Sequence, residues 1–217
     1  AGRQLTGEPW CHARPFAYCG SVGVPLDDVP ARLRRQFESL APVLAGCGLR
    51  GAVGVDVVVD SAGAAWVVEV NPRPTASLEL VERSTGLSIA AAHVAACGGA
   101  VPARDSVPTA TATVDTRHAK AIVHAPRDLS IDAALVERIC DWRRQWSPTA
   151  ACPGIADIPR PGSSIPAGGP ICTVFAAGRS EAAVMAELRD RAAAVLVAFS
   201  PRGDAARRPA VPPRSIP

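Results

Sequence analysis

The chain is poor in aromatic residues, in lysine and in long apolar runs. Aromatic residues make up 4% of its 217 residues, the net charge is only +3, and Lys120 is the only lysine. No basic face with interleaved aromatics appears, so the composition argues against a nucleic-acid partner. No apolar run reaches the ~20 residues that a membrane-spanning helix needs, so we also expect no membrane partner.

The cysteines lack the spacing of a metal or disulfide framework. There are seven, an odd number, and no C-x-x-C pair occurs. This pattern excludes the usual zinc spacings and favours free thiols in a reducing cytoplasm. Cys19 in particular is expected to be a buried thiol rather than a nucleophile, because no base is placed beside it.

What is present supports a folded α+β protein. Hydrophobic residues make up 48% of the chain, enough to bury a sizeable core, and 21 prolines and 18 glycines indicate many turns. We predict a strand at 14–19, a loop at 20–25, and a helix beginning near Asp27 or Asp28 and ended by Gly46 and Gly48. Later strands are expected at 109–114, 119–124 and 171–176, a linker at 101–108, and helices at 77–81, 88–97, 131–142 and 180–199.

The clearest local pattern is a β-hairpin. Residues 52–59 and 65–70 are β-branched and apolar, and the turn sequence Asp60-Ser61-Ala62-Gly63 separates them. Asp56 interrupts the first apolar run and Glu69 interrupts the second. Because burying an unpaired carboxylate is costly, two carboxylates facing one place suggest a cation between them.

Two more polar residues continue this row. Asn71 and Arg73 follow Glu69 at spacings of two, so an extended strand places all three on one face. Two carboxylates and an amide oxygen suit Mg²⁺, and an arginine fork suits a phosphate or carboxylate. The alternative is a plain hairpin whose carboxylates pair with surface arginines.

The run VVEVNPRPTASLEL resembles the closing signature of the ATP-grasp superfamily, and is especially similar to the carboligase-like branch related to biotin carboxylase. The segments RQLTGEPW…FAYCGSVG and DIPRPGSSIPAGGPICTVFAAG also resemble that branch, so the likeness covers roughly residues 3–200. It implies that Asp56, Glu69 and Asn71 bind Mg²⁺ or Mn²⁺ bridging the phosphates of ATP. Arg73 would contact the reacting groups as the catalytic residue.

The resemblance implies an organisation as well. Residues 1–100 would form an ATP-grasp C-terminal subdomain, an antiparallel sheet with packed helices that contains the metal-binding hairpin. Residues 101–200 would form a small C-terminal α/β domain, and residues 201–217 a disordered tail. The glycine-rich phosphate loop and lysine pair typical of the superfamily do not precede Asp56, so we expect a C-terminal fragment that is inactive alone.

The function that the resemblance implies is an ATP- and Mg²⁺-dependent ligase that activates a small carboxylate as an acyl phosphate and joins it to an amine. The resemblance is also compatible with a homodimer. The alternative is a non-catalytic nucleotide-binding or regulatory remnant. Glu79 resembles a family carboxylate near the substrate, although a solvated helix face explains it equally well. His93 is expected to be a packing residue.

Overall fold

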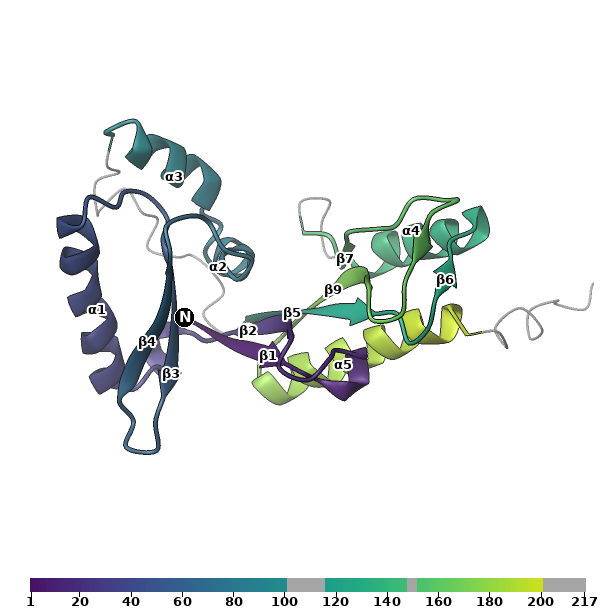
Figure 1. Ribbon diagram of the computed structural model, residues 1–217, viewed down its shortest axis with the longest axis horizontal. Helices are drawn as coiled ribbons and strands as arrows, with labels where there is room; N and C mark the ends of the chain where they lie inside the picture. The colour runs from purple at the N-terminus through teal and green to yellow at the C-terminus, as the bar shows by residue number, and fades with distance from the viewer. Residues whose placement is uncertain (101–115, 148–151, 201–217) are drawn as a thin grey trace, which may run out of the picture.

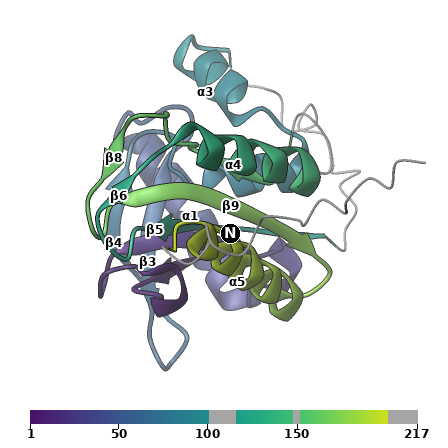
Figure 2. The same ribbon diagram turned by 90° about the vertical axis from the view of Figure 1, so that its right-hand side faces the viewer.

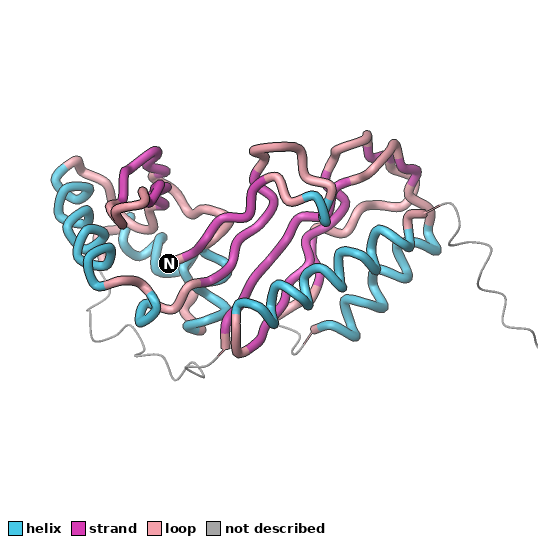
Figure 3. Tube along the Cα trace, turned by 90° about the horizontal axis from the view of Figure 1, so that it is seen from below, coloured by secondary structure: helices cyan, strands magenta, loops and turns pink. Residues whose placement is uncertain are grey.

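The computed structural model describes residues 1–100, 116–147 and 152–200. A five-stranded sheet forms its centre, in the order β1 (Gly2–Thr6), β2 (Tyr18–Gly23), β5 (Arg117–His124), β9 (Pro170–Gly178) and β7 (Ile155–Ala156) (Figures 1 and 3). Every neighbouring pair in this order is antiparallel. A small second sheet pairs β6 (Leu129–Ser130) with β8 (Ser164–Ile165).

Helices cover both faces of the central sheet. Helix α5 (Glu181–Ala198) packs against β5 and β9, and α4 (Ala133–Trp146) packs against β7. Figure 2 shows α4 and α5 on opposite sides of β9. Because the strand is covered from both sides, six consecutive residues of β9 are buried instead of alternating with exposed ones. The core includes the fully buried side chains of Ile139 and Leu188.

The other elements form a second group beside the sheet. A two-stranded hairpin of β3 (Gly54–Val59) and β4 (Ala65–Asn71) stands next to α1 (Ala31–Gly46), with α2 (Leu78–Thr85) and α3 (Ile89–Cys97) following along the chain (Figure 1). Helix α2 follows the hairpin in the chain and contacts β2 and β5 of the central sheet. Two short 3-10 helices, η1 (Pro9–Cys11) and η2 (Leu26–Asp28), complete the described elements.

Most of the expected elements are present. The hairpin, the helix capped by Ser88 and the last helix capped by Ser180 are confirmed. The helix that ends at Gly46 is present, but its expected start is wrong: it begins at Ala31, and Asp27 and Asp28 lie in the separate 3-10 helix η2. The expected turn at 77–81 is the start of the longer α2. The linker at 101–108, the strand at 109–114 and the tail at 201–217 lie outside the described residues.

The expected loop at 20–25 is wrong for its first four residues. Gly20 to Gly23 belong to β2, which lies between β1 and β5, and the expected strand at 14–19 overlaps β2 only at its end. The glycines indicate close strand contact here, not a turn. A Cβ on Gly20 would lie 2.2 Å from the backbone oxygen of Lys120.

The described part is a mixed α+β structure with antiparallel sheets, and the central sheet crosses the boundary predicted near residue 100. Strands β1 and β2 come from before it, and β5, β7 and β9 come from after it. The division into an ATP-grasp C-terminal subdomain and a small α/β domain stays a prediction. No helix among the described residues is long and apolar enough to cross a membrane.

Candidate functional site on the β3–β4 hairpin

The turn of the hairpin is built by one aspartate. Asp60 Oδ1 accepts hydrogen bonds from the backbone N–H groups of Ala62 and Ala64, each at 2.9 Å, and Asp60 Oδ2 accepts from Trp66 Nε1 at 2.8 Å. These bonds lower the pKa of the Asp60 carboxyl, with the Trp66 contact the largest cause. Gly63 adopts φ +74°, which glycine tolerates without strain. The turn thus fixes the register of both strands.

That register brings the predicted residues together. Asp56 on β3 lies directly opposite Glu69 on β4, and Gly54 lies opposite Asn71. Val57 pairs with Val67, so the ladder has a bulge between Asp56 and Val57. Opposite residues of an antiparallel pair project to the same face, so the two carboxylates share a face with Asn71.

A short chain of polar contacts links these side chains. Gln4 Nε2 donates to Asp56 Oδ1 at 2.9 Å, and Asn71 Nδ2 lies 3.4 Å from Asp56 Oδ2. Arg73 Nη2 donates to Asn71 Oδ1 at 3.2 Å. The amide of Asn71 therefore sits between an anion and a cation, and its buried position fixes the spacing of the two. Gln4 connects the hairpin to β1 of the central sheet.

All four predicted residues line one cavity of about 390 Å³. Tyr18, Thr75 and Ser77 are also on its wall. Tyr18 Oη lies 2.9 Å from Ser21 Oγ, and its pKa is raised, mainly by burial and further by the charges of Cys19, Glu79 and Asp56. The phenol is therefore neutral at physiological pH and can donate a hydrogen bond to a bound anion.

The hairpin is less buried than its composition predicts. Asp56 is half-buried, but Glu69 and Arg73 are exposed, so the argument that both carboxylates are buried is wrong for Glu69. Trp66 and Val68 of β4 also keep 64% and 66% of their surface exposed. The reason is structural: in the described residues β3 and β4 pair only with each other, so their outer edges carry no further strand.

The types of oxygen ligand at this site suit a hard divalent cation, but the orientation of the Asn71 amide does not. Asp56, Glu69 and the Asn71 amide offer oxygen ligands from one face, which is the type that Mg²⁺ prefers when phosphates complete its shell. In the structure the Asn71 oxygen faces Arg73 and its nitrogen faces Asp56, so metal binding requires the amide to rotate. No group of three or more His, Cys, Asp or Glu side chains able to hold a metal occurs among the described residues.

Four further residues of the cavity wall were not predicted from the sequence: Gln4, Tyr18, Thr75 and Ser77. Thr75 and Ser77 continue the spacing of two beyond Arg73, a signal that was available. Gln4 and Tyr18 reach the cavity from β1 and β2, whose position beside the hairpin depends on contacts distant in sequence.

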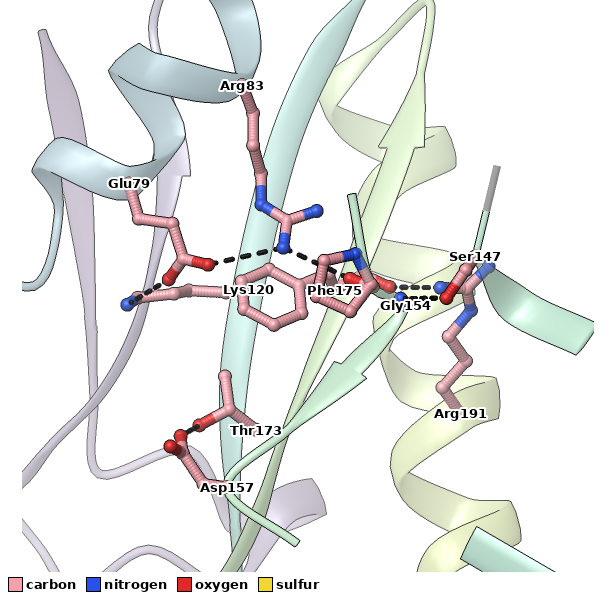
Figure 4. Close-up of polar contacts among 10 residues, drawn as sticks. Glu79, Arg83, Lys120, Ser147, Gly154, Asp157, Thr173, Phe175 and Arg191 are labelled. Atoms are coloured by element: carbon pink, nitrogen blue, oxygen red, sulfur yellow. Dashed lines mark hydrogen bonds and ion pairs between the residues drawn. The ribbon is translucent and has the colours of Figure 1, made fainter. Parts of the chain in front are cut away.

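The other candidates have structural partners. Glu79 on α2 pairs with Arg83 and Lys120, each at 3.2 Å, as Figure 4 shows. His93 accepts a hydrogen bond from the backbone N–H of Ala52 at 3.0 Å, as expected of a packing residue. Cys19 is fully buried, with its Sγ 3.3 Å from the carbonyl of Leu5, as the sequence analysis expects of a buried thiol.

Comparison with known proteins agrees with the resemblance. Residues 3–77, which contain all four predicted site residues, match the family model described as an ATP-grasp domain. The ATP-grasp resemblance is thus confirmed for residues 3–77. No curated protein matches the chain significantly.

Solved structures share the fold at low identity. An L-amino acid ligase from Bacillus licheniformis aligns with a TM-score of 0.57 and 16% identity, over 81% of this chain and 44% of that one. Pyruvate carboxylase of Rhizobium etli aligns with a TM-score of 0.59 and 16% identity, over 90% of this chain and 21% of that one. An N5-carboxyaminoimidazole ribonucleotide synthetase, solved as an ADP complex, aligns with a TM-score of 0.50 and 16% identity, over 84% of this chain and 41% of that one. The chain therefore spans less than half the length of these proteins.

Proposed function

We propose that the chain is part of an ATP-dependent ligase that joins a small carboxylate to an amine, and that the hairpin cavity holds the phosphates of ATP through a divalent metal. The observation that carries this proposal is the convergence of Asp56, Glu69, Asn71 and Arg73 on one cavity within the matched residues. ATP would supply the phosphoryl group that activates the carboxylate as an acyl phosphate.

The chain's own residues have distinct roles in this proposal. Asp56 and Glu69 hold Mg²⁺ or Mn²⁺ by their carboxylates, and Asn71 adds its amide oxygen. Arg73 positions an oxyanion, since its guanidinium can form paired hydrogen bonds with a phosphate or carboxylate. Catalysis of this type depends mainly on positioning and on neutralising charge, so fixed spacing of these groups matters more than their acidity.

Binding of ADP with Mg²⁺, measured by isothermal titration calorimetry, tests the assignment. We expect saturable binding that weakens about tenfold or more in Glu69→Gln, which removes a charged ligand of the metal, and in Arg73→Gln, which removes a charged contact to the phosphates. Arg35→Gln is the matched control, since Arg35 is exposed on α1 and does not line the cavity. Absence of binding, or equal binding by all variants, contradicts the proposal.

The second candidate is a non-catalytic nucleotide-binding or regulatory domain, which would keep the hairpin cavity without a glycine-rich phosphate loop and lysine pair. Removing one preorganised catalytic group costs about 3–4 kcal/mol of barrier, so we expect no ATP turnover by these 217 residues alone. Phosphate release that depends on Glu69 would contradict this expectation. Coding sequence for such a loop and lysine pair upstream of Ala1 would favour the ligase over the second candidate.

A further inference from the structure

A second cavity, of about 430 Å³, lies away from the hairpin site. Its wall comes from α2, β5, α4, residues 152–154, β9 and α5, and it shares no lining residue with the hairpin cavity. Its size is within the range of small-molecule sites. The side chains that define it, which we call the arginine pocket, are Arg83, His118, Trp146, Phe175, Glu187 and Arg191.

Arg83 is a buried cation with an unused donor. Its side chain is only 9% exposed, and its guanidinium carbon lies 3.8 Å above the centre of the Phe175 ring. Nη2 donates to Glu79 Oε1 at 3.2 Å (Figure 4). It also donates to the carbonyl of Pro153 at 3.0 Å. Nε is buried and has no hydrogen-bond partner among the described residues. Because Nε is enclosed, a ligand in the pocket would have to use Nη1, which makes no hydrogen bond within the described part of the chain and belongs to a side chain that lines the cavity.

Arg191 brings a second guanidinium to the same wall. It donates to the carbonyl of Phe175 and to Glu187, so in Figure 4 the two arginines approach Phe175 from different elements. Its guanidinium carbon lies 5.2 Å from the centre of the Trp146 ring, and Trp146 stacks in parallel on Trp142 at 5.1 Å. The pocket thus combines two cations with a rigid aromatic surface.

The charges around the arginine pocket do not cancel. Glu187 balances Arg191, but the single carboxylate of Glu79 serves both Arg83 and Lys120. One positive charge is therefore left over in the network. The pKa of His118 is lowered by burial and by the nearby Arg83, so this ring adds no charge at neutral pH.

We propose that the arginine pocket binds a small carboxylate with an aromatic or apolar body. The carboxylate would accept from Nη1 of Arg83, while its body would lie against Trp146 and the neighbouring Pro153 and Ala176. The apolar wall favours such a ligand over free phosphate, which would leave that surface in water. This site is separate from the hairpin cavity, and its occupancy does not depend on ATP or metal.

Calorimetric titration of the 217-residue chain with benzoate, without nucleotide or metal, tests the proposal. We expect saturable binding of benzoate, at least about tenfold weaker binding of the neutral isostere benzamide, and weaker binding of inorganic phosphate. Comparing these three probes requires no variant, so the result does not depend on whether a mutant folds. No saturable benzoate binding up to about 10 mM, equal binding of benzamide, or tighter binding of phosphate would overturn it.

Two variants locate the site. Arg191→Gln and Arg83→Gln should each weaken benzoate binding about tenfold or more, with helical content checked by circular dichroism. Arg191→Gln leaves the contacts of Arg83 with Glu79 and Pro153 intact, so it remains informative if Arg83→Gln unfolds. The matched control is Arg189→Gln, an exposed arginine of the same helix that is not on the pocket wall. Benzoate binding unchanged in Arg191→Gln would place the ligand elsewhere and refute the proposal.

Discussion

Replacing Gly20 by alanine tests the strand contact at the centre of the sheet. Gly20 pairs with Ala121 across β2 and β5, and a Cβ there would lie 2.2 Å from the Lys120 oxygen and 2.9 Å from the Ala121 Cα. Both neighbours are backbone atoms, so no side chain can rotate away. The strands must separate locally, and the hydrogen bonds of the ladder must lengthen to accommodate one methyl group.

The cost follows from this geometry. Overpacking a core typically costs 1–3 kcal/mol, and here the clash is with backbone, so we expect a loss of about 3 kcal/mol in the free energy of unfolding. For a chain of this size, each kcal/mol lowers the melting temperature by roughly 2–4 °C. Urea unfolding followed by circular dichroism should therefore show a clear fall in the midpoint urea concentration. Thermal unfolding followed in the same way should show a melting temperature about 6–12 °C lower.

Gly46→Ala is the matched control. Gly46 is the last residue of α1, and a Cβ there would meet nothing within 4 Å. Alanine favours the helix more than glycine does, so this variant should be neutral or more stable by up to about 1 kcal/mol. If Gly20→Ala unfolds at the same urea concentration as the wild type, the close β2–β5 contact and the placement of residues 20–23 in a strand are refuted.

Two further predictions concern titratable groups. The pKa of His118 is lowered from 6.5, mainly by burial, so as pH falls through that value the unfolded chain takes up a proton that the folded chain resists, and stability is lost on acidification. His118→Gln should flatten this part of the pH dependence of the urea midpoint, and an unchanged profile would contradict the assignment. Burial raises the pKa of Cys172 to about 12, so DTNB at pH 8 should modify the exposed Cys47 and Cys97 and leave Cys172 unmodified until the protein unfolds. Early labelling of Cys172, detected by mass spectrometry, would contradict its burial.

Local patterns were sufficient for the hairpin. The turn at Asp60 to Gly63 and the apolar runs beside it are encoded within about twenty residues, and the spacing of two from Glu69 to Arg73 correctly places those side chains on one cavity. Strand pairing distant in sequence was not predictable in the same way. The local sequence around Gly20 suggests a turn. The glycine is explained only by the pairing of β2 with β5, which lies about one hundred residues later in the chain.

The exposure of the site residues could not be predicted from the sequence either. The apolar run of β4 predicts burial, yet Val68 and Glu69 are exposed because the described residues provide no strand beyond the hairpin edges. The contact between Gln4 and Asp56 could not be predicted either, since it depends on how β1 approaches the hairpin. Periodicity identifies a face, but the elements that cover that face are set by tertiary structure.

Whether the hairpin holds a divalent metal can be measured by a Mn²⁺ titration followed by electron paramagnetic resonance. We expect saturable binding that weakens about tenfold or more in Asp56→Asn and in Glu69→Gln, because each removes a charged oxygen ligand. Glu38→Gln, which removes an exposed carboxylate of α1 outside the cavity, should bind like the wild type. Absence of saturable Mn²⁺ binding, or equal affinity in all four proteins, would contradict the account.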